Sequence, residues 1–380
     1  MKEITIPTRK PSYYEQKVKK LFDMAGITIN GREDFDVQVN DLRFFRRVLS
    51  TGSIGLGESY LDQWWECKKL DEFFSRVIHS GLEQYARHDI STWLAILHSK
   101  LVNLQGIKEA YENASFHYDL GNDLYKCMLD KRLTYTCGYW KNATNLDEAQ
   151  EDKLELTCQK LHLEPGMSIL DIGCGWGSFA KYASEKYDVM VTGINVSQEQ
   201  ITLGKQLCQD LPVELKLQDY REIDGQYDRV VSLGMFEHVG LKNYRTYFEV
   251  VNNCLKPDGI FLLHTIGTNV SSKTNDPWIT KYIFPNSLIP SLAQITAAAD
   301  GLFTIEDLHN FGTDYDKTLM AWEKNFTQHW PLLKKQYEDR FYRMWRYYLL
   351  CSAGAFRARK NQLLQIIYSK GLKSGYIPIR

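Results

Sequence analysis

A glycine-rich loop is the first feature of the sequence whose residue types and spacing could do chemistry. Gly173, Gly175 and Gly177 stand between the apolar run 168–172 and the helical pattern 178–187. A loop between a buried strand and a helix is where an open α/β sheet binds its ligand. Because glycine lacks a Cβ atom, the backbone can turn tightly and a nucleoside can lie against the main chain. We therefore expect this loop to bind a cofactor.

The spacing of the loop separates two classes of cofactor. Dinucleotide sites use G-x-G-x-x-G and hold a diphosphate at the helix N-terminus, whereas this loop is G-x-G-x-G. Asp171 precedes it, and the loop has no basic residue that could bind phosphate. S-adenosylmethionine fits better than a nicotinamide dinucleotide, because its tail is an amino acid and its sulfonium is a cation. A tight turn with a purely structural purpose is the alternative.

Further candidate cofactor residues follow the next two expected strands. Asn195 and Val196 end the second strand, and Gln200 lies one turn into the helix behind it. We expect the Asn195 and Gln200 amides to bind the ribose hydroxyls, a task that an acidic residue usually performs. Asp219 and Tyr220 follow the third strand and could flank the adenine. For Asp219 a helix N-cap or a turn is the alternative.

Two ionisable side chains follow later strands. Glu237 lies in an otherwise apolar and glycine-rich stretch, where an unpaired carboxylate would be costly, so a functional role is favoured. His264 stands near the end of the expected strand 259–266. A hydrogen-bonded core histidine is the alternative there. Cys137 taken alone indicates a small buried hydrophobe, and Tyr315 taken alone carries no signal.

A parallel sheet would bring these residues together. From residue 168 onward, strand-like runs alternate with helical ones, which is typical of an α/β fold with a mostly parallel sheet. The expected strands are 168–172, 189–195, 213–217, 227–233, 259–266, 304–308 and 365–368. The expected helices are 178–187, 197–208 and 244–253, and the segment 317–348 is helical by periodicity.

The texture of the sequence changes near residue 105. Before it, 13–25 and 41–51 look helical, the glycine-rich segment 52–57 leads into 58–65, and 70–80 and 93–104 follow. We expect a smaller, mostly helical N-terminal domain over 1–104, a linker over 105–116 and a catalytic domain over 117–380. The apolar stripes of the first domain could contact lipid or another subunit, but packing inside the protein is the commoner explanation.

Composition excludes several classes of protein. Lys plus Arg number 46 and Asp plus Glu 47 among 380 residues, so no overall charge favours nucleic acid. A basic stretch over 1–20 could attract anionic lipid, with an ordinary solvated helix face as the alternative.

We expect a cytoplasmic protein without a spanning helix, since the start has no signal-peptide pattern and the uncharged stretch 282–299 contains prolines. The eight cysteines show no zinc spacing, which predicts reduced thiols and no metal.

The motifs together resemble the cyclopropane fatty acid synthases of bacteria and, more distantly, the mycolic acid cyclopropane synthases and methyltransferases. The resemblance covers essentially the whole chain, including 55–60 and 64–66 near the N-terminus. The segments that carry it are 117–122, 135–140, 234–240, 263–267 and 312–315.

The resemblance implies a class I S-adenosylmethionine-dependent methyltransferase. Such an enzyme transfers a methyl group to the cis double bond of an unsaturated acyl chain in membrane phospholipid. The carbocation then loses a proton from the new methyl group, and a cyclopropane ring closes. The implied base is a bound bicarbonate. Glu237 accepts a hydrogen bond from the hydroxyl of the bicarbonate, and other groups donate to its oxygens. The residues that hold it carry over to Cys137, Glu237, His264, Tyr315 and the main-chain amide of Ile266.

Further expectations follow from the resemblance. Tyr135 and Thr136 join the cofactor contacts. Aromatic rings in or near the motif segments could shelter the sulfonium and the carbocation, with core packing as the alternative; they are Tyr135, Tyr139, Trp140, Phe236 and Tyr247. The partners implied are the phospholipid bilayer surface and a second copy in a homodimer, with the protein peripheral on the inner face of the cell membrane. A methyl-branched or hydroxylated lipid product and a non-catalytic lipid-binding protein are the alternatives. Some relatives have a proposed catalytic cysteine where this chain has Ser352, and Cys351 stands one place earlier.

Overall fold

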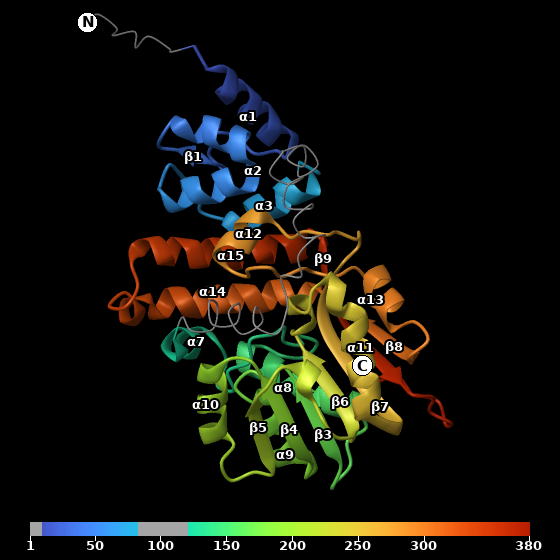
Figure 1. Ribbon diagram of the computed structural model, residues 1–380. Coiled ribbons are helices and arrows are strands. Elements are labelled where there is room, and N and C mark those ends of the chain that lie inside the picture. The colour runs from blue at the N-terminus through green and yellow to red at the C-terminus, as the bar shows by residue number, and fades with distance from the viewer. Residues whose placement is uncertain (1–9, 83–120) are drawn as a thin grey trace, which may run out of the picture.

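The computed structural model describes residues 10–82 and 121–380 (Figure 1). A seven-stranded sheet in the order β5-β4-β3-β6-β7-β9-β8 forms its lower half. The strands are β3 (Ser168–Ile172), β4 (Met190–Asn195), β5 (Val213–Leu217), β6 (Tyr227–Leu233), β7 (Leu255–Thr268), β8 (Thr304–Asn310) and β9 (Asn361–Ser369). The first five are parallel, and β9 runs antiparallel to both β7 and β8. The predicted mostly parallel, seven-stranded sheet is confirmed.

Both faces of the sheet are covered, which explains why its strands are nearly continuous apolar runs. On one face Ile169 packs with apolar residues of α8 (Leu146–Lys160), α9 (Ser178–Tyr187) and α10 (Gln198–Leu207). On the other face Leu170 and Ile172 pack with α11 (Tyr244–Cys254). The chain builds outward from β3 to β5 and then returns to place β6 beside β3. This reversal opens a crevice at the carboxyl ends of the strands, where such sheets bind ligands.

A helical hairpin stands between β8 and β9 in the sequence. The periodicity of 317–348 indicated one helical segment, but the structure divides it into α14 (Thr313–Leu333) and α15 (Asp339–Arg357). The chain reverses over 334–338, a polar turn that periodicity did not register. The reversal lets the two helices stack their rings, as in the Trp330–Tyr342 pair with centroids 4.8 Å apart. In Figure 1 this hairpin lies across the molecule between the sheet and the N-terminal helices.

The described N-terminal residues are mostly helical. They form α1 (Tyr13–Met24), α2 (Arg43–Leu61), α3 (Leu70–His79) and a two-stranded sheet of β1 (Gln38–Val39) and β2 (Trp65–Glu66). The glycine-rich segment 52–57 is part of α2, which is kinked where Gly52 has φ 57°. The expected helix 93–104, the linker 105–116 and the motif residues 117–120 lie outside the described residues, as do residues 1–9 of the basic stretch.

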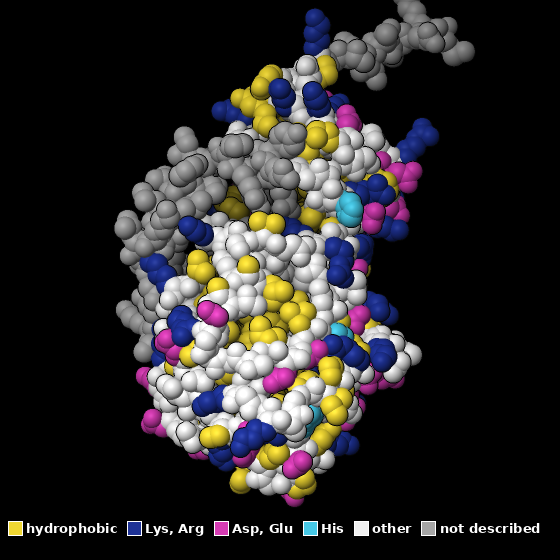
Figure 2. All heavy atoms as spheres, turned by 90° about the vertical axis from the view of Figure 1, so that its right-hand side faces the viewer, with side chains coloured by type: hydrophobic (Ala, Val, Ile, Leu, Met, Phe, Trp, Pro, Cys, Tyr) yellow, Lys and Arg dark blue, Asp and Glu magenta, His cyan; other side chains and the backbone are white. Residues whose placement is uncertain are grey.

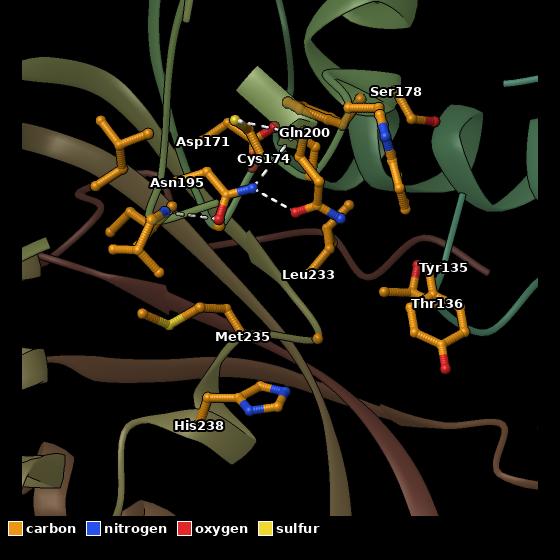
Figure 3. A pocket seen from close by; sticks show the side chains of 18 of the residues that line it. Tyr135, Thr136, Asp171, Cys174, Ser178, Asn195, Gln200, Leu233, Met235 and His238 are labelled. Atoms are coloured by element: carbon orange, nitrogen blue, oxygen red, sulfur yellow. Dashed lines mark hydrogen bonds between the residues drawn. The ribbon is translucent and has the colours of Figure 1, made fainter. Parts of the chain in front are cut away.

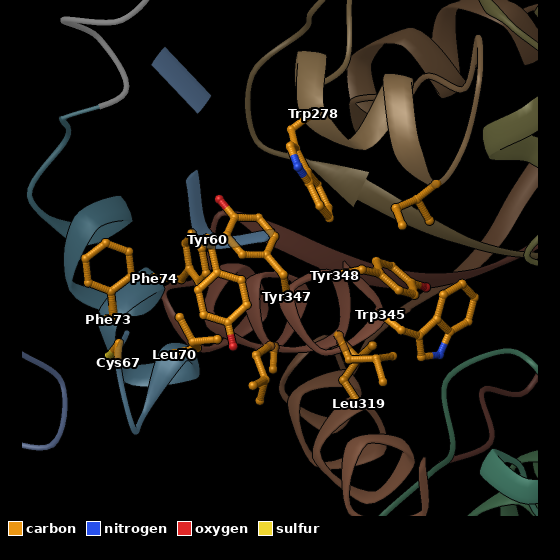
Figure 4. Packing of buried hydrophobic residues seen from close by; sticks show 14 of the residues in the cluster. Tyr60, Cys67, Leu70, Phe73, Phe74, Trp278, Leu319, Trp345, Tyr347 and Tyr348 are labelled. Atoms are coloured by element: carbon orange, nitrogen blue, oxygen red, sulfur yellow. The ribbon is translucent and has the colours of Figure 1, made fainter. Parts of the chain in front are cut away.

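One hydrophobic core joins the N-terminal helices to the hairpin (Figure 4). Tyr347 of α15 has ring centroids 5.6 Å from Tyr60, 5.0 Å from Phe74 and 4.4 Å from Trp278, which lies on α12 (Pro277–Tyr282). A Cβ atom added to Gly354 would lie 2.7 Å from the carbonyl oxygen of Asp71, so α3 and α15 touch at the backbone. Burial of each large side chain contributes about 1.5–3 kcal/mol. These contacts hold the hairpin in place between the N-terminal helices and the sheet (Figure 1). In the described ranges no helix is both long and apolar enough to cross a membrane.

Candidate active site

A pocket lies at the carboxyl ends of β3, β4 and β6, beside the glycine-rich loop (Figure 3). Ten of the eleven predicted cofactor residues line it: Tyr135, Thr136, Asp171, Gly173, Gly175, Asn195, Val196, Gln200, Asp219 and Tyr220. Gly177, the eleventh, lies outside the lining and begins α9. A Cβ atom added there would be 3.1 Å from the Sγ atom of Cys208, so this glycine permits close packing instead.

The loop itself needs glycine for a steric reason. Gly173 has φ 83°, and a Cβ atom there would lie 2.6 Å from the Cβ atom of Met235 at the end of β6. A side chain would therefore both strain the backbone and collide with the opposite wall of the pocket. The motif brings β3 and β6 together as a floor for the ligand.

The predicted amide pair is formed. Nδ2 of Asn195 donates to Oε1 of Gln200 at 2.6 Å, and Oδ1 of Asn195 accepts from the amide of Val196 at 2.8 Å. Ser197 is the N-cap of α10, and its hydroxyl accepts a hydrogen bond from the backbone amide of Gln200. This bond holds Gln200 on the first turn of the helix. Asn195 at the end of β4 and Gln200 on the first turn of α10 thus both lie at the pocket wall, as Figure 3 shows.

Asp219 lines the pocket and also takes the alternative role considered for it. It is the N-cap of a short 3-10 helix, where its side chain accepts from the Arg221 amide at 3.0 Å. It also pairs with the Arg221 guanidinium at 2.7 Å. Tyr220 next to it packs its ring 5.3 Å from Tyr247 of the core. This corner of the pocket is therefore rigid.

Asp171 is the strongest electrostatic feature of the pocket. Its side chain is 1% exposed, and neither carboxylate oxygen has a hydrogen-bond partner among the described residues. Burial raises the pKa of Asp171 to about 7, although the charge of Lys153 opposes the shift. An unpaired buried carboxylate is costly unless a cation joins it. The cationic amino-acid tail of S-adenosylmethionine fits this requirement.

Lys153 is a pocket residue that the sequence did not distinguish, because it is one lysine among several polar residues of α8. It is fully buried, and its Nζ atom donates to Oγ1 of Thr136 at 2.9 Å. Burial lowers the pKa of Lys153 to about 8. The bond fixes the Thr136 hydroxyl at the pocket wall.

The five predicted catalytic residues gather beside this pocket. Cys137, Ile266 and Tyr315 belong to one small cluster with Phe311 and Leu363. The ring of His264 has its centroid 5.9 Å from that of Phe311, and Glu237 is hydrogen-bonded to Ile266. The five predicted residues, which come from four separate segments of the sequence, therefore meet in one place.

Glu237 is held by a backbone amide. Its Oε1 atom accepts from the amide of Ile266 at 2.7 Å, whereas Oε2 is buried and has no partner among the described residues. The resemblance assigned that amide to the bicarbonate, but in this structure it donates to Glu237. Burial raises the pKa of Glu237 to about 7, and the amide opposes the shift.

His264 offers the complementary group. It is 1% exposed, and burial together with the charges of Lys153 and Lys160 lowers its pKa well below the ordinary value, so the ring is neutral. Nδ1 contacts Nε2 of Gln365 at 3.3 Å, and Nε2 of His264 has no partner in the described part of the chain. Oε2 of Glu237 and Nε2 of His264, which have no hydrogen-bond partner among the described residues, fit a small anion that carries a hydroxyl.

Cys137 and Tyr315 are the remaining predicted side chains. Burial raises the pKa of the Cys137 thiol well above its ordinary value, and Sγ lies 3.1 Å from the carbonyl oxygen of Gly138. Cys137 is therefore a thiol and not a thiolate nucleophile. Tyr315 packs its ring 4.5 Å from Phe356 of α15, so the hairpin positions it.

The pocket and the cluster adjoin each other along two chain segments. Thr136 lines the pocket while its neighbour Cys137 belongs to the cluster. His238 likewise lines the pocket while its neighbour Glu237 bonds to Ile266. Burial lowers the pKa of His238 to about 4, which leaves a neutral ring beside the cofactor pocket.

Fewer of the predicted aromatic rings line the pocket than the sequence indicated. Of Tyr135, Tyr139, Trp140, Phe236 and Tyr247, Tyr135 lines the pocket. Its hydroxyl lies 2.9 Å from that of Tyr348, and its ring 5.0 Å from that of Trp322. Phe236 and Tyr247 instead pack against each other in the core at 5.2 Å.

Comparisons with known proteins identify the family of the chain. The family model of mycolic acid cyclopropane synthetase matches residues 105–366. The cyclopropane-fatty-acyl-phospholipid synthase of Escherichia coli K12 is 50% identical over 375 residues, which span 99% of this chain and 97% of that protein. The chain belongs to the mycolic acid cyclopropane synthetase family.

Solved structures of family members share the fold. A mycolic acid cyclopropane synthase complexed with SAH and CTAB is 32% identical, with a TM-score of 0.64, over 68% of this chain and 98% of that one. A cyclopropane synthase from Mycobacterium tuberculosis is 28% identical, with a TM-score of 0.66, over 71% of this chain and 100% of that one. This member of the cyclopropane synthetase family has the class I methyltransferase fold. It is an S-adenosylmethionine-dependent methyltransferase.

Proposed function

We propose that this enzyme transfers a methylene group from S-adenosylmethionine to the cis double bond of unsaturated acyl chains in membrane phospholipids, forming cyclopropane fatty acids. The observation that carries the proposal is the adjacency of the pocket that contains Asp171 to the buried pair of Glu237 and His264. Identity of 50% with a cyclopropane-fatty-acyl-phospholipid synthase over 99% of the chain supports the same substrate class.

The pocket residues hold the cofactor in this proposal. S-adenosylmethionine supplies an electrophilic methyl group when it is bound. The Asp171 carboxylate accepts from its ammonium group, and Asn195 and Gln200 bind its ribose hydroxyls. The Tyr135 ring lines the pocket, and a ring face would stabilise the bound sulfonium cation by about 0.5–2 kcal/mol.

The cluster holds bicarbonate, which supplies the proton acceptor. Glu237 accepts the hydroxyl hydrogen through Oε2, and His264 and Tyr315 donate to the other oxygens. The neutral Cys137 thiol, which donates to the Gly138 carbonyl oxygen, forms part of the wall of the cluster. The Ile266 amide contributes by fixing Oε1 of Glu237. A held anion beside a developing carbocation also stabilises the transition state electrostatically.

The reaction can be tested with the purified full-length protein. It is incubated with labelled S-adenosylmethionine and unsaturated phospholipid vesicles, and the lipids are analysed by mass before and after hydrogenation. A cyclopropane product gains CH2 and retains no double bond to hydrogenate. A product that is methyl-branched or hydroxylated would contradict the proposal and assign the enzyme to the alternative lipid methylation.

The anion is tested separately in the same assay. Carbonate is stripped from the buffer, and bicarbonate is then added back while label transfer is followed. We expect the rate to fall on stripping and to recover on addition. If the stripped enzyme runs at full speed, the bound-anion mechanism is wrong and Glu237 becomes the candidate for a direct base.

We also propose that the enzyme works as a cytoplasmic homodimer, peripheral on the inner face of the membrane, with segment 1–104 providing lipid or subunit contacts. At the N-terminal end of the structure Tyr13 is 65% exposed and Tyr14 37% exposed, beside exposed Lys17 and Lys20. Figure 2 shows hydrophobic and basic side chains together at this end. Cosedimentation with anionic and neutral vesicles tests the contact, and sedimentation equilibrium tests the dimer.

A further inference from the structure

A row of polar side chains crosses three neighbouring strands next to the cluster. His264 of β7 pairs with Gln365 of β9, which in turn pairs with His309 of β8. Directly paired residues in a sheet project from the same face, so the three side chains form a line. His264 and Gln365 are at most 1% exposed. The row leads outward from the site through the sheet.

A buried lysine covers the row. Lys160, the last residue of α8, is fully buried, and its Nζ atom donates to Oε1 of Gln365 at 2.9 Å and contacts Nδ1 of His309 at 3.0 Å. Both partners are neutral side chains, since burial also lowers the pKa of His309 to about 4. Burial lowers the pKa of Lys160 to about 7, although the charge of Asp307 opposes the shift. A cation here is therefore costly to the fold, which suggests a functional reason for the lysine.

The hydrogen bonds determine which way the Gln365 amide faces. In its protonated form Lys160 only donates, so the atom of Gln365 that faces it is the oxygen. The Thr157 hydroxyl donates to the carbonyl oxygen of Lys153 at 2.7 Å, and it therefore accepts from Nε2 of Gln365 at 3.3 Å. Both contacts require the same orientation. The second hydrogen on Nε2 of Gln365 is thus directed at Nδ1 of His264.

The tautomer of His264 follows from that orientation. Nδ1 accepts from Gln365, so in a neutral ring the hydrogen is on Nε2, the atom without a partner among the described residues. We propose that Lys160 and Gln365 are positioning residues that fix His264 in the Nε2–H tautomer, so that it presents a donor to the anion. This inference rests on the proposed function, in which His264 holds bicarbonate. With the opposite tautomer, a lone pair would face the anion oxygen.

The test uses the full-length protein and two variants. In Gln365→Glu the carboxylate can only accept, so it should draw the ring hydrogen to Nδ1. Lys160→Met removes one of the two contacts that orient Gln365, leaves the weaker one to Thr157, and should raise the share of the Nδ1–H tautomer. His309→Phe is the matched control, because it removes the other contact of Lys160 and leaves the Gln365 bonds in place. Thermal unfolding establishes that each variant is folded.

Nitrogen NMR of histidine-labelled protein is the first readout, since ring correlations report which nitrogen carries the hydrogen. The His264 signal is assigned by its loss in His264→Gln. We expect Nε2–H in the wild type and in His309→Phe, and Nδ1–H in Gln365→Glu. If the His264 ring keeps its hydrogen on Nε2 in both Gln365→Glu and Lys160→Met, the proposal is overturned.

Binding of carbon-13 bicarbonate, followed by line broadening, is the second readout. We expect affinity to fall by about tenfold or more in Gln365→Glu, the size known for orienting partners of a ligand-holding histidine. Affinity for S-adenosylhomocysteine should be unchanged. A changed tautomer with unchanged bicarbonate affinity overturns the positioning role. Absence of bicarbonate binding in the wild type, with tautomers that respond as expected, instead contradicts the proposed function.

Discussion

The backbone amide of Ile266 donates to Oε1 of Glu237 at 2.7 Å and leaves Oε2 as the oxygen without a partner in the described structure. One oxygen of the carboxylate is thus committed to holding the side chain in place. The other remains an acceptor in a buried space. Because the amide belongs to β7, it also fixes Glu237 relative to His264 two residues earlier on the same face of the strand.

Glu237→Gln should lower turnover by about 100-fold or more, the size expected for losing a positioned acid–base group. The amide oxygen can still accept from Ile266, but an NH2 group then replaces the free acceptor. Affinity for S-adenosylhomocysteine should persist, because Glu237 does not line the cofactor pocket. Label transfer to vesicle lipid and titration calorimetry measure the two quantities. Equal losses of turnover and of cofactor affinity would contradict this assignment.

Asp171→Asn should remove a pH dependence of cofactor binding. Burial raises the pKa of Asp171 to about 7, so the carboxyl loses its proton as the pH rises through that value. The ionised form attracts the ammonium group of the ligand. Wild-type affinity for S-adenosylhomocysteine should therefore rise by about tenfold between roughly pH 5.5 and pH 7.5. This window lies on the acid side of the pKa of Lys153, which burial lowers to about 8.

The matched control for this experiment is Glu237→Gln. Burial also raises the pKa of Glu237 to about 7, but its side chain lies outside the pocket lining. The control should keep the pH dependence, whereas Asp171→Asn should bind weakly at every pH. A dependence that vanishes in Glu237→Gln and survives in Asp171→Asn would reverse the assignment.

Local patterns predicted the strands around the cofactor loop with high fidelity. The bounds of β3, β5 and β6 match the expected strands, because apolar runs bounded by turns have little alternative in a sheet covered on both faces. The cofactor residues that end those strands could be predicted from the sequence for the same reason. The local context of Glu237 already favoured a functional role, but the roles given to Glu237, His264, Cys137 and Tyr315 came from the family resemblance. Long-range packing brings these residues together.

Other features depend on partners distant in the sequence. Lys153 and Lys160 are ordinary helix residues until the fold buries them against Thr136 and Gln365. The antiparallel direction of β9 and the reversal of the hairpin at 334–338 are set by tertiary packing that hydrophobic periodicity does not encode. The sequence could not connect Gln365 with His264 for this reason.

Cys351→Ser should leave turnover within about twofold of the wild type. The Cys351 thiol is half-buried and contacts the carbonyl oxygen of Tyr348 at 3.3 Å, and burial raises its pKa. Methyl transfer from a sulfonium to an alkene needs no protein nucleophile. Ser352→Ala is the matched control for helix α15. A loss above about 100-fold in Cys351→Ser with folding intact, roughly 2.7 kcal/mol of barrier, would make the thiol essential.

Gly354→Val should separate the N-terminal helices from the hairpin. A Cβ atom at this position would lie 2.7 Å from the carbonyl oxygen of Asp71 and from the Cβ atom of Phe74, and backbone cannot move aside as a flexible side chain can. Such overpacking costs about 1–3 kcal/mol in the free energy of unfolding. Urea denaturation, with Ser352→Ala as the control on the same helix, measures the loss.

The same variant tests the role proposed for segment 1–104. The cofactor pocket lies at the carboxyl ends of β3, β4 and β6, so affinity for S-adenosylhomocysteine should survive Gly354→Val. Methylene transfer to vesicle lipid should fall, because α3 would no longer be fixed against α15 and its domain would present the membrane contacts in a different orientation. Turnover is measured at a temperature where the variant is fully folded. If the free energy of unfolding falls as expected but turnover on vesicles is unchanged, the N-terminal segment stabilises the fold and does not deliver lipid to the site.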